Sequence, residues 1–252
     1  MKTKHQLCLG DCLGWLPQLT TDRPFDTLFA DPPDNIGLGY GEYRDNLPEA
    51  DYLDLMGVWL KLFLRSAKTV WMSFNAKWTI PMGAIAAELK DVEIKPCVQT
   101  FTFGQNRRTD LVNAHRPLWR FRKPDAPLYP ERIKVPSWRQ QHGDRRAAEG
   151  GKVPGDVFDF PRVTGNSRQR RSWHPTQLNE GLVERCLKLT TPLGGRICDP
   201  FAGTGTTLRV AKETDFLCTL IEVDSTYCAH IAAEHEMELR ESGDWSRWIL
   251  DK

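Results

Sequence analysis

The sequence lacks any long hydrophobic run. No stretch among its 252 residues approaches the roughly 18 apolar residues that a membrane-spanning helix requires. The N-terminus is basic, but no apolar segment of signal-peptide length follows it. We therefore expect a cytoplasmic protein without a membrane partner. The composition is otherwise typical of a folded domain, with 40% hydrophobic and 27% charged residues.

Paired cysteines are also missing. The 7 cysteines form no CxxC pair, and several lie in apolar stretches such as RICDP and FLCTLIE. This pattern predicts buried free thiols in a reducing compartment. Because no group of cysteines and histidines has the spacing of zinc ligands, we predict no metal site.

Net charge is nearly absent, but the charges are unevenly distributed. The formal net charge is +1, yet residues 105–171 contain 16 Lys/Arg and 7 Asp/Glu, a local excess of +9 that leaves −8 on the rest. A basic middle on an acidic body is typical of a face that binds a polyanion. By itself the excess is weak support for nucleic-acid binding, because charge runs are more often solvated surface.

Segments with strand and helix patterns alternate along the chain. Leu53, Met56, Leu60 and Leu64 recur at helical spacing, whereas DTLFA at 26–30 is typical of a short buried strand. Strands are expected at 26–30, 69–74, 93–101, 117–121, 194–200 and 216–224, and helices from Glu49 and at 78–90, 176–190, 203–213 and 224–240. Between about 122 and 172 the periodicity disappears, which predicts loops. The alternation predicts an α/β fold with a doubly wound, mostly parallel sheet.

A glycine-containing loop, DPFAGTGTT at 199–207, joins a predicted strand to a predicted helix. Its glycines let the backbone pass close to a ligand, and open α/β sheets bind ligands at the carboxyl ends of strands. Glu222 ends the next strand, where a carboxylate is suited to hold ribose hydroxyls. The loop has Leu208 where a dinucleotide fingerprint has its third glycine, and it lacks the Lys-Ser/Thr of a phosphate loop. A nucleoside ligand is therefore favoured over a nicotinamide cofactor, and a structural turn remains open.

A second motif, Asp31-Pro32-Pro33-Asp34, follows the strand predicted at 26–30. One interpretation is a rigid turn, because proline cannot continue a central strand. The other is chemical. The exocyclic amine of adenine or cytosine is a poor nucleophile, because its lone pair is delocalised into the ring. Hydrogen-bond acceptors for its two N–H groups favour a pyramidal nitrogen whose lone pair points at an electrophile. Asp31 and the carbonyl of Pro32 are suited to be those acceptors, and the prolines stiffen the loop. This chemistry needs neither a covalent intermediate nor a metal.

Together these residues resemble the amino-methylating DNA methyltransferases, the N6-adenine and N4-cytosine family, in the order of its permuted β class. LGDCL at 9–13, HPTQ at 174–177, DPFAGTGTT and IEVDSTYCAHIAAE are similar to the segments of that family and stand in its order. The resemblance extends over most of residues 1–252. It implies a class I, Rossmann-like methyltransferase with S-adenosylmethionine as cofactor and double-stranded DNA as substrate.

The resemblance also implies the site residues. The catalytic segment is Asp31, Pro32, Pro33 and Asp34. The cofactor site comprises Asp11, Cys12, Asp31, His174, Thr176, Asp199, Phe201, Ala202, Gly203, Thr204, Gly205, Thr206, Thr207, Glu222 and Val223. Residues 104–172 correspond to an inserted target-recognition segment, in which the candidates for DNA contacts are Gln105, Asn106, Arg107, Arg108, Arg168, Arg170 and Arg171. For any single arginine a solvated surface charge is the commoner role.

Two positions depart from the family pattern. Asp34 stands where the family usually has an aromatic residue, and base stacking on such a ring is worth about 1–3 kcal/mol. Tyr40, Tyr43 or Trp78 are candidates to supply the ring, or Asp34 hydrogen-bonds the base, or the target differs. The second departure is Leu178-Asn179, where the family commonly has Lys-Pro.

An aspartate at the first motif position favours adenine N6 over cytosine N4. Methylation of RNA and a catalytically silent DNA-binding relative remain alternatives, whereas a protein amide substrate is disfavoured because that class usually carries Asn-Pro-Pro. A second copy of the chain and a cognate restriction enzyme remain open as partners.

Overall fold

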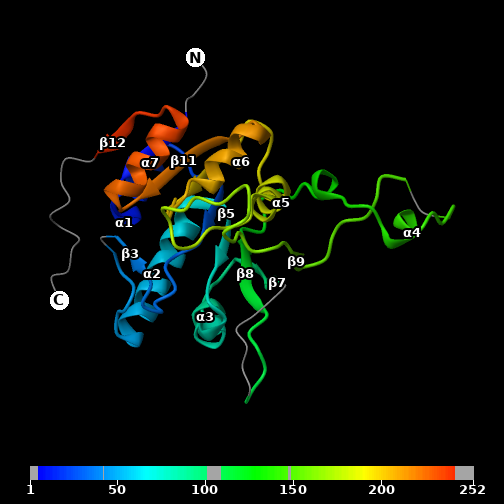
Figure 1. Ribbon diagram of the computed structural model, residues 1–252, viewed down its shortest axis with the longest axis horizontal. Coiled ribbons are helices and arrows are strands. Elements are labelled where there is room, and N and C mark those ends of the chain that lie inside the picture. Colours follow the sequence, from blue (N-terminus) through cyan, green and yellow to red (C-terminus); the bar gives the residue numbers. More distant parts are fainter. Residues whose placement is uncertain (1–4, 42, 101–108, 147–148, 242–252) are drawn as a thin grey trace.

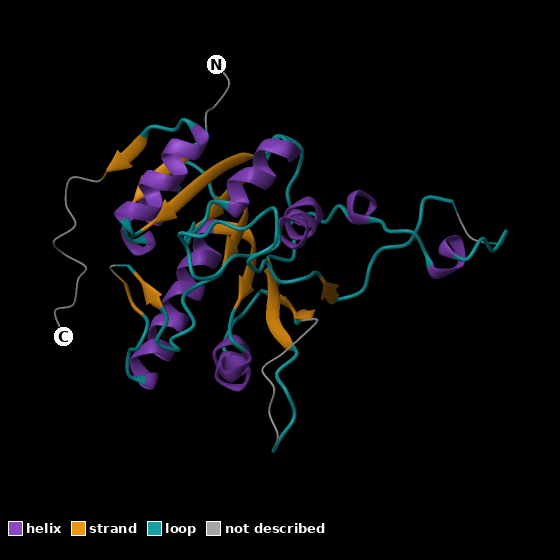
Figure 2. Cartoon of the chain, viewed as in Figure 1, coloured by secondary structure: helices purple, strands orange, loops and turns teal. Residues whose placement is uncertain are grey.

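The computed structural model describes residues 5–41, 43–100, 109–146 and 149–241 (Figure 1). Helices and strands alternate through most of this range (Figure 2). In chain order the elements are β1 (Gln6–Leu9), α1 (Cys12–Leu19), β2 (Phe25–Ala30), β3 (Gly39–Tyr40), β4 (Tyr43–Arg44), α2 (Glu49–Ser66), β5 (Ala67–Ser73), η1 (Ala76–Trp78), α3 (Thr79–Ala87), β6 (Glu93–Lys95), β7 (Val98–Thr100), β8 (His115–Arg122), η2 (Pro130–Ile133), α4 (Trp138–Gln141), β9 (Val157–Asp159), α5 (Glu180–Thr190), β10 (Arg196–Asp199), α6 (Thr206–Thr214), β11 (Leu217–Glu222), α7 (Ser225–His235) and β12 (Leu239–Glu241).

Within the described residues the main sheet has 10 strands: nine in the order β12-β1-β11-β10-β2-β5-β8-β7-β9, and β6, which pairs with β8. From β12 to β5 all neighbours are parallel. The strand β8 is antiparallel to β5, β6 and β7, while β9 is parallel to β7. The predicted α/β fold with a mostly parallel sheet is confirmed.

Both faces of the sheet are covered by helices. Side chains of a strand point alternately to opposite faces, so Leu28 and Ala30 join the hydrophobic core beneath α1, α2 and α3. The residue between them, Phe29, joins a second core with α5, α6 and α7. Burial on both faces explains why these strands are apolar almost throughout rather than alternating in polarity. The doubly wound arrangement predicted from the alternation of elements is therefore confirmed.

The strand order reverses between β2 and β10. The connection from β10 through α6 leads to β11 on one side, whereas the connection from β2 through α2 leads to β5 on the other. The two strands are parallel neighbours, with Cys198 opposite Leu28, so the loops that follow them start side by side. Such a reversal opens a crevice at the carboxyl ends of the strands, the usual ligand site of open α/β sheets.

Two predicted elements end at different residues. The strand expected at 93–101 is divided into β6 and β7, which pair with different halves of β8. Pro96 lies between them, and proline has no N–H to donate to a strand ladder. The helix expected at 224–240 ends at His235, because Glu236 adopts a left-handed conformation with φ of 53°. The chain then forms β12 at the edge of the sheet.

Part of the basic middle, 104–172, belongs to the main sheet. Within its described residues, β8 and β9 are strands of the main sheet. Of the described residues between these two strands, those around η2 pack against α5, and those that follow form an arm that carries the short helix α4 (Figure 1). Ser137 begins that helix with a capping box, in a stretch that lacks periodicity in the sequence.

All 7 cysteines are buried and free, as predicted. Among residues 5–41, 43–100, 109–146 and 149–241, the structure has no helix that is both long and apolar enough to cross a membrane.

Candidate active site

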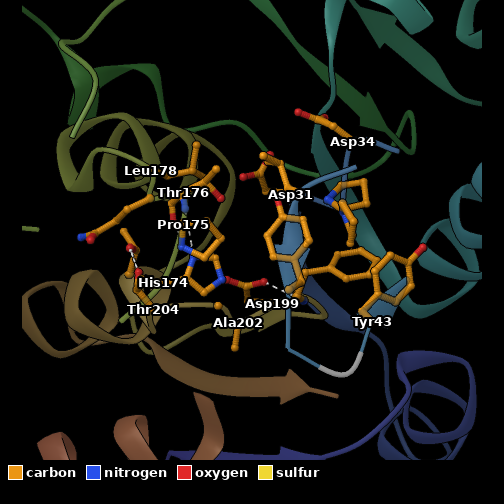
Figure 3. Close-up of a pocket in the computed structure, with 18 of the residues that line it drawn as sticks. Asp31, Asp34, Tyr43, His174, Pro175, Thr176, Leu178, Asp199, Ala202 and Thr204 are labelled. Atoms are coloured by element: carbon orange, nitrogen blue, oxygen red, sulfur yellow. Dashed lines mark hydrogen bonds between the residues drawn. The ribbon is translucent and has the colours of Figure 1, made fainter. Parts of the chain in front are cut away.

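A cleft of about 810 Å³ opens where the chain leaves β2 and β10. Three segments that are far apart in sequence converge on it: 31–34 after β2, 174–178 before α5, and 199–204, which starts at the last residue of β10. Figure 3 shows their side chains facing one cavity, with Asp31 on one side and His174 and Thr204 on the other. The cleft therefore occupies the crevice that the strand order creates.

The cleft collects nearly all of the residues predicted for catalysis and cofactor binding. Those that line it are Asp11, Cys12, Asp31, Pro32, Pro33, Asp34, His174, Thr176, Asp199, Phe201, Ala202, Gly203, Thr204, Thr206, Thr207, Glu222 and Val223. Gly205 does not line it. That glycine is the N-cap of α6 with φ of 73°, a conformation that glycine adopts without strain. It therefore allows the turn from the loop into α6.

Asp199 ties the end of β10 to the first turn of α6. One carboxylate oxygen accepts from the backbone N–H of Phe201 at 3.0 Å, and the other accepts from the hydroxyl of Thr207 at 2.6 Å. Burial raises the pKa of Asp199 to about 7, against the lowering effect of these two hydrogen bonds. The side chain thus holds the glycine loop in shape.

Glu222, at the end of β11, faces the glycine loop. Its oxygens accept from the N–H of Gly203 at 2.8 Å and from the N–H of Asp224 at 3.0 Å. Burial raises the pKa of this carboxyl group. On the neighbouring strand, Leu9 pairs with Glu222, which brings Asp11 to the same end of the cleft. Asp11 caps α1 by accepting from the N–H of Leu13 at 2.8 Å.

His174 packs directly on the glycine loop. A Cβ at Gly203 would lie 3.2 Å from the Nε2 atom of His174, so a side chain there would press on the ring. The ring centroid is 4.6 Å from that of Tyr227 and 5.8 Å from that of Tyr40. Burial lowers the pKa of His174, which favours a neutral imidazole. These rings form an aromatic wall beside the loop.

The segment 31–34 is held by an arginine that the motifs did not predict. Arg116, in β8, donates from Nη2 to Asp31 at 2.7 Å and from Nη1 to Asp34 at 2.6 Å. Its Nε donates to the hydroxyl of Ser73, at the end of β5, at 2.6 Å. Burial opposes the charge on the guanidinium, but the two carboxylates raise its pKa overall. Burial raises the pKa of Asp31, and Arg116 partly offsets that effect.

Sequence reasoning missed Arg116 because no motif surrounds it. The one available signal was a cation inside a strand pattern, HRPLWRFR, next to a predicted sheet whose loops carry carboxylates. Other cleft residues without a motif include Asn75, Gln99, Asn113, His115 and Arg162. Several of these come from the antiparallel part of the sheet, which only the tertiary fold brings to the cleft.

Two of the three candidates for an aromatic ring near the base reach the cleft. Tyr40 and Tyr43, in β3 and β4, line it. Trp78 is fully buried and lies outside the lining; its indole N–H donates to the carbonyl of Asp34 at 2.8 Å. Trp78 therefore supports the backbone of the motif through this hydrogen bond, and its ring does not line the cavity.

The candidates for DNA contacts are only partly described. Gln105, Asn106, Arg107 and Arg108 lie outside the described residues. Arg168 is exposed and Arg170 is half-buried. The guanidinium of Arg171 is already engaged, because its Nε and Nη2 atoms donate to the carboxylate of Glu234 at 2.9 and 2.5 Å. DNA contact stays a prediction for all of them.

Comparison with known proteins shows the family to which the sequence is similar and the solved structures that share its fold. A family model described as DNA methylase, of the N6/N4 methyltransferase type, matches residues 25–234. The DNA adenine methyltransferase YhdJ of Escherichia coli (strain K12) is 26% identical over 272 residues, which cover 94% of this chain and 89% of that protein.

Solved structures agree on the fold. The PvuII DNA methyltransferase, described as cytosine-N4-specific, superimposes with a TM-score of 0.67 at 15% identity and covers 91% of this chain and 86% of its own. The complex of M1.HpyAVI with S-adenosylmethionine gives 0.61 at 15% identity, with 92% and 99% covered.

Proposed function

The chain belongs to the N6/N4 DNA methylase family, and from this membership we propose that it transfers a methyl group from S-adenosylmethionine to an exocyclic amine in DNA, preferentially adenine N6. The observation that carries the proposal is the convergence of the 31–34 motif and the 199–207 loop on one cleft. Acceptors for an amine and a cradle for a nucleoside then face each other, as direct transfer between two bound molecules requires.

The cleft residues fit a nucleoside cofactor. The cavity volume is within the range of about 300–1,000 Å³ that small-molecule sites occupy. Each oxygen of Glu222 accepts one backbone N–H, which leaves further lone pairs for the two hydroxyls of a ribose. Asp11 stands at the same end to accept from an adenine amine. When bound, the cofactor supplies an electrophilic methyl group.

The amine is activated by the segment that follows β2. A base that leaves the DNA stack enters the cleft, where Asp31 accepts one N–H and the carbonyl of Pro32 accepts the other. These two acceptors direct the nitrogen lone pair toward the methyl carbon. The nitrogen would form a bond to the methyl carbon as the sulfonium–methyl bond breaks with its electron pair on sulfur, and one proton would leave the nitrogen along its hydrogen bond to Asp31. Pro33 and the buried Trp78 keep the segment rigid, so little ordering is left for the transition state.

Asp31 at the first motif position is the basis for choosing adenine. Both specificities occur among the similar proteins: YhdJ is named an adenine methyltransferase and PvuII methyltransferase is described as cytosine-N4-specific. Double-stranded DNA as the substrate is supported by the excess of +9 in residues 105–171. We assign target recognition to residues 104–172, with the exposed Arg168 as a candidate for phosphate contact.

The test is a labelled methyl transfer. Purified protein is incubated with tritiated S-adenosylmethionine and unmethylated DNA, beside an Asp31→Ala control, and the DNA is digested to nucleosides. We expect label in N6-methyladenine that is absent from the control. Label in N4-methylcytosine would correct the base and keep the class. No label in DNA, with the cofactor still bound, would contradict the proposal and favour RNA or a silent DNA-binding relative.

A further inference from the structure

The fourth residue of the motif, Asp34, is buried rather than directed to solvent. It is 8% exposed, and its Oδ2 atom accepts from Arg116 at 2.6 Å. Its Oδ1 atom is also buried and has no hydrogen-bond partner among the described residues. A buried carboxylate with a single charged partner depends on that partner, because removing one member of such a pair leaves an uncompensated charge.

Arg116 joins three separate parts of the site. Its three donor atoms reach Asp31, Asp34 and Ser73, and the arginine side chain is 16% exposed. The guanidinium group is planar and presents its N–H donors in a fixed fork, so these contacts set the orientation of every partner. Asp34 lies three residues from Asp31, and the lowering effect of Arg116 on the pKa of Asp31 is larger than the raising effect of Asp34.

The contact with Arg116 also makes the two carboxylate oxygens of Asp31 inequivalent. Its Oδ1 atom accepts from Nη2 at 2.7 Å, while the side chain as a whole remains 26% exposed on the cleft. One oxygen is thus held by the protein, and the carboxylate keeps acceptor capacity toward the cavity.

We propose that Arg116 is the positioning residue of this active site and that Asp34 is its anchor, so that the guanidinium fixes Asp31 in the orientation that receives the target amine. Asp34 then occupies the fourth motif position to hold Arg116, not to contact the base. The inference rests on the proposed function, since it concerns how the same site binds an amine. It also predicts that Asp34→Tyr lowers the turnover number, because the ring removes the anchor.

The proposal is tested through the titration of Asp31, which does not need turnover. The charged and titratable groups that face Asp31 are Arg116 from β8, Asp34 from its own loop, Asp199 after β10 and Tyr40 from β3. Arg116 lowers the pKa of Asp31, whereas Asp34 raises it. Arg116→Gln should therefore shift the Asp31 titration to higher pH. Asp34→Asn removes the like charge but keeps an oxygen that can accept from Arg116, so it should shift the titration to lower pH. Asp34→Leu removes the same charge and also the acceptor that holds Arg116, so Asp31 should titrate at higher pH in this variant than in Asp34→Asn.

The comparison of Asp34→Leu with Asp34→Asn separates positioning from the effect of charge, because both variants lose the same carboxylate and only one loses the acceptor for Arg116. The titration is followed by NMR of the carboxyl carbon of Asp31 in the cofactor-free protein, with Asp31→Asn to assign the signal. The matched control is Arg122→Gln. Arg122 lies on the same strand, is also largely buried and pairs with Glu93 away from the cleft, so its loss should leave the Asp31 titration in place.

Kinetics supply the second readout. A misplacement of about 1 Å can cost about 100-fold in rate, so Arg116→Gln should lower kcat by that order while the Kd for the cofactor is unchanged. Arg116→Lys keeps the charge and should restore the titration of Asp31 but only part of kcat, because an ammonium group lacks the fork.

The outcomes are distinguishable from those of the proposed function. If the native protein methylates no nucleic acid, the proposed function fails, and the titrations of the variants still decide whether Arg116 and Asp34 position Asp31. If the native protein methylates DNA but Arg116→Gln leaves the titration unmoved, or Asp31 titrates alike in Asp34→Leu and Asp34→Asn, the positioning role is overturned and the proposed function stands.

Discussion

Asp199 is a buried carboxyl group that holds the glycine loop, and its protonation links the loop to pH. Its pKa is raised from 3.8 to about 7, so the folded state binds this proton more tightly than the unfolded state. The free energy of unfolding should therefore fall as the pH rises through that interval and become independent of Asp199 above it. Asp199→Asn should remove this slope, as measured by urea denaturation of the cofactor-free protein at several pH values.

Thr207→Val is the matched control for this prediction. The Thr207 hydroxyl donates to Asp199 and lowers its pKa, so its loss should extend the slope to higher pH while the carboxyl group stays in place. Identical pH slopes in the native protein and in Asp199→Asn would show that Asp199 does not titrate differently on folding.

A second residue-scale prediction concerns Glu222. Glutamine at this position presents one carbonyl oxygen, which cannot serve the N–H of Gly203, the N–H of Asp224 and two ribose hydroxyls together. Hydrogen bonds to charged groups contribute about 1.5–3 kcal/mol, so Glu222→Gln should weaken S-adenosylmethionine binding by about 10- to 100-fold. Isothermal titration calorimetry measures the change. Glu213→Gln, on the exposed side of α6, should bind normally, and equal loss in both variants would count against the role of Glu222.

At the scale of the element, the departure at Leu178-Asn179 has a structural explanation. The helix expected from Thr176 begins at Glu180, because the side chain of Asn179 accepts from the N–H of Gly181 at 2.9 Å and so caps α5. The same side chain donates to the carbonyl of Pro161 at 3.1 Å. The residues before the cap, 174–178, are thereby left as a loop that lines the cleft.

The cap gives a prediction about stability. Asn179→Ala should lower the free energy of unfolding by about 1 kcal/mol, the usual loss when a side-chain cap is removed. Asn179→Asp keeps the acceptor and should retain most of the stability. Chemical denaturation followed by circular dichroism compares the two variants. A loss as large in the aspartate variant would place the contribution in the contact with Pro161 instead.

Elements with a strong hydrophobic period were predictable, and those without one were not. The helix α2 begins at the expected Glu49, and β2 and β5 lie where apolar runs occur, because burial on both faces imposes such runs. The short strands β3, β4 and β12 have only two or three residues each, too few to show a period. Their conformation depends on the partner strand rather than on their own sequence.

At the scale of the whole molecule, the basic segment predicts a salt-dependent affinity for DNA. Arg168 is exposed in the loop between the cleft-lining residues 162–163 and 174–178. Arg168→Ala should weaken binding to all DNA sequences alike and reduce the slope of log K against log salt by about 1. Fluorescence anisotropy at several salt concentrations measures the slope.

Lys90→Ala is the control for that measurement. Lys90 is also exposed, but it precedes β6, which pairs with the end of β8 that is remote from the cleft. Its removal should leave the slope unchanged. Equal effects of the two substitutions would indicate attraction by overall charge and not a defined DNA-binding face.

The sequence by itself determined the class of the fold, the two motifs and about half of the residues that line the cleft, because these depend on local patterns: periodicity, glycine and proline positions, and short spacings. Only the tertiary structure decided that Asp34 is buried against Arg116, that Trp78 is buried, and that Arg116 lies between two carboxylates. Arg116 is 85 and 82 residues from its partners, and their contact requires β8 to lie antiparallel beside β5. No local pattern records that pairing, since it follows from how the whole sheet packs.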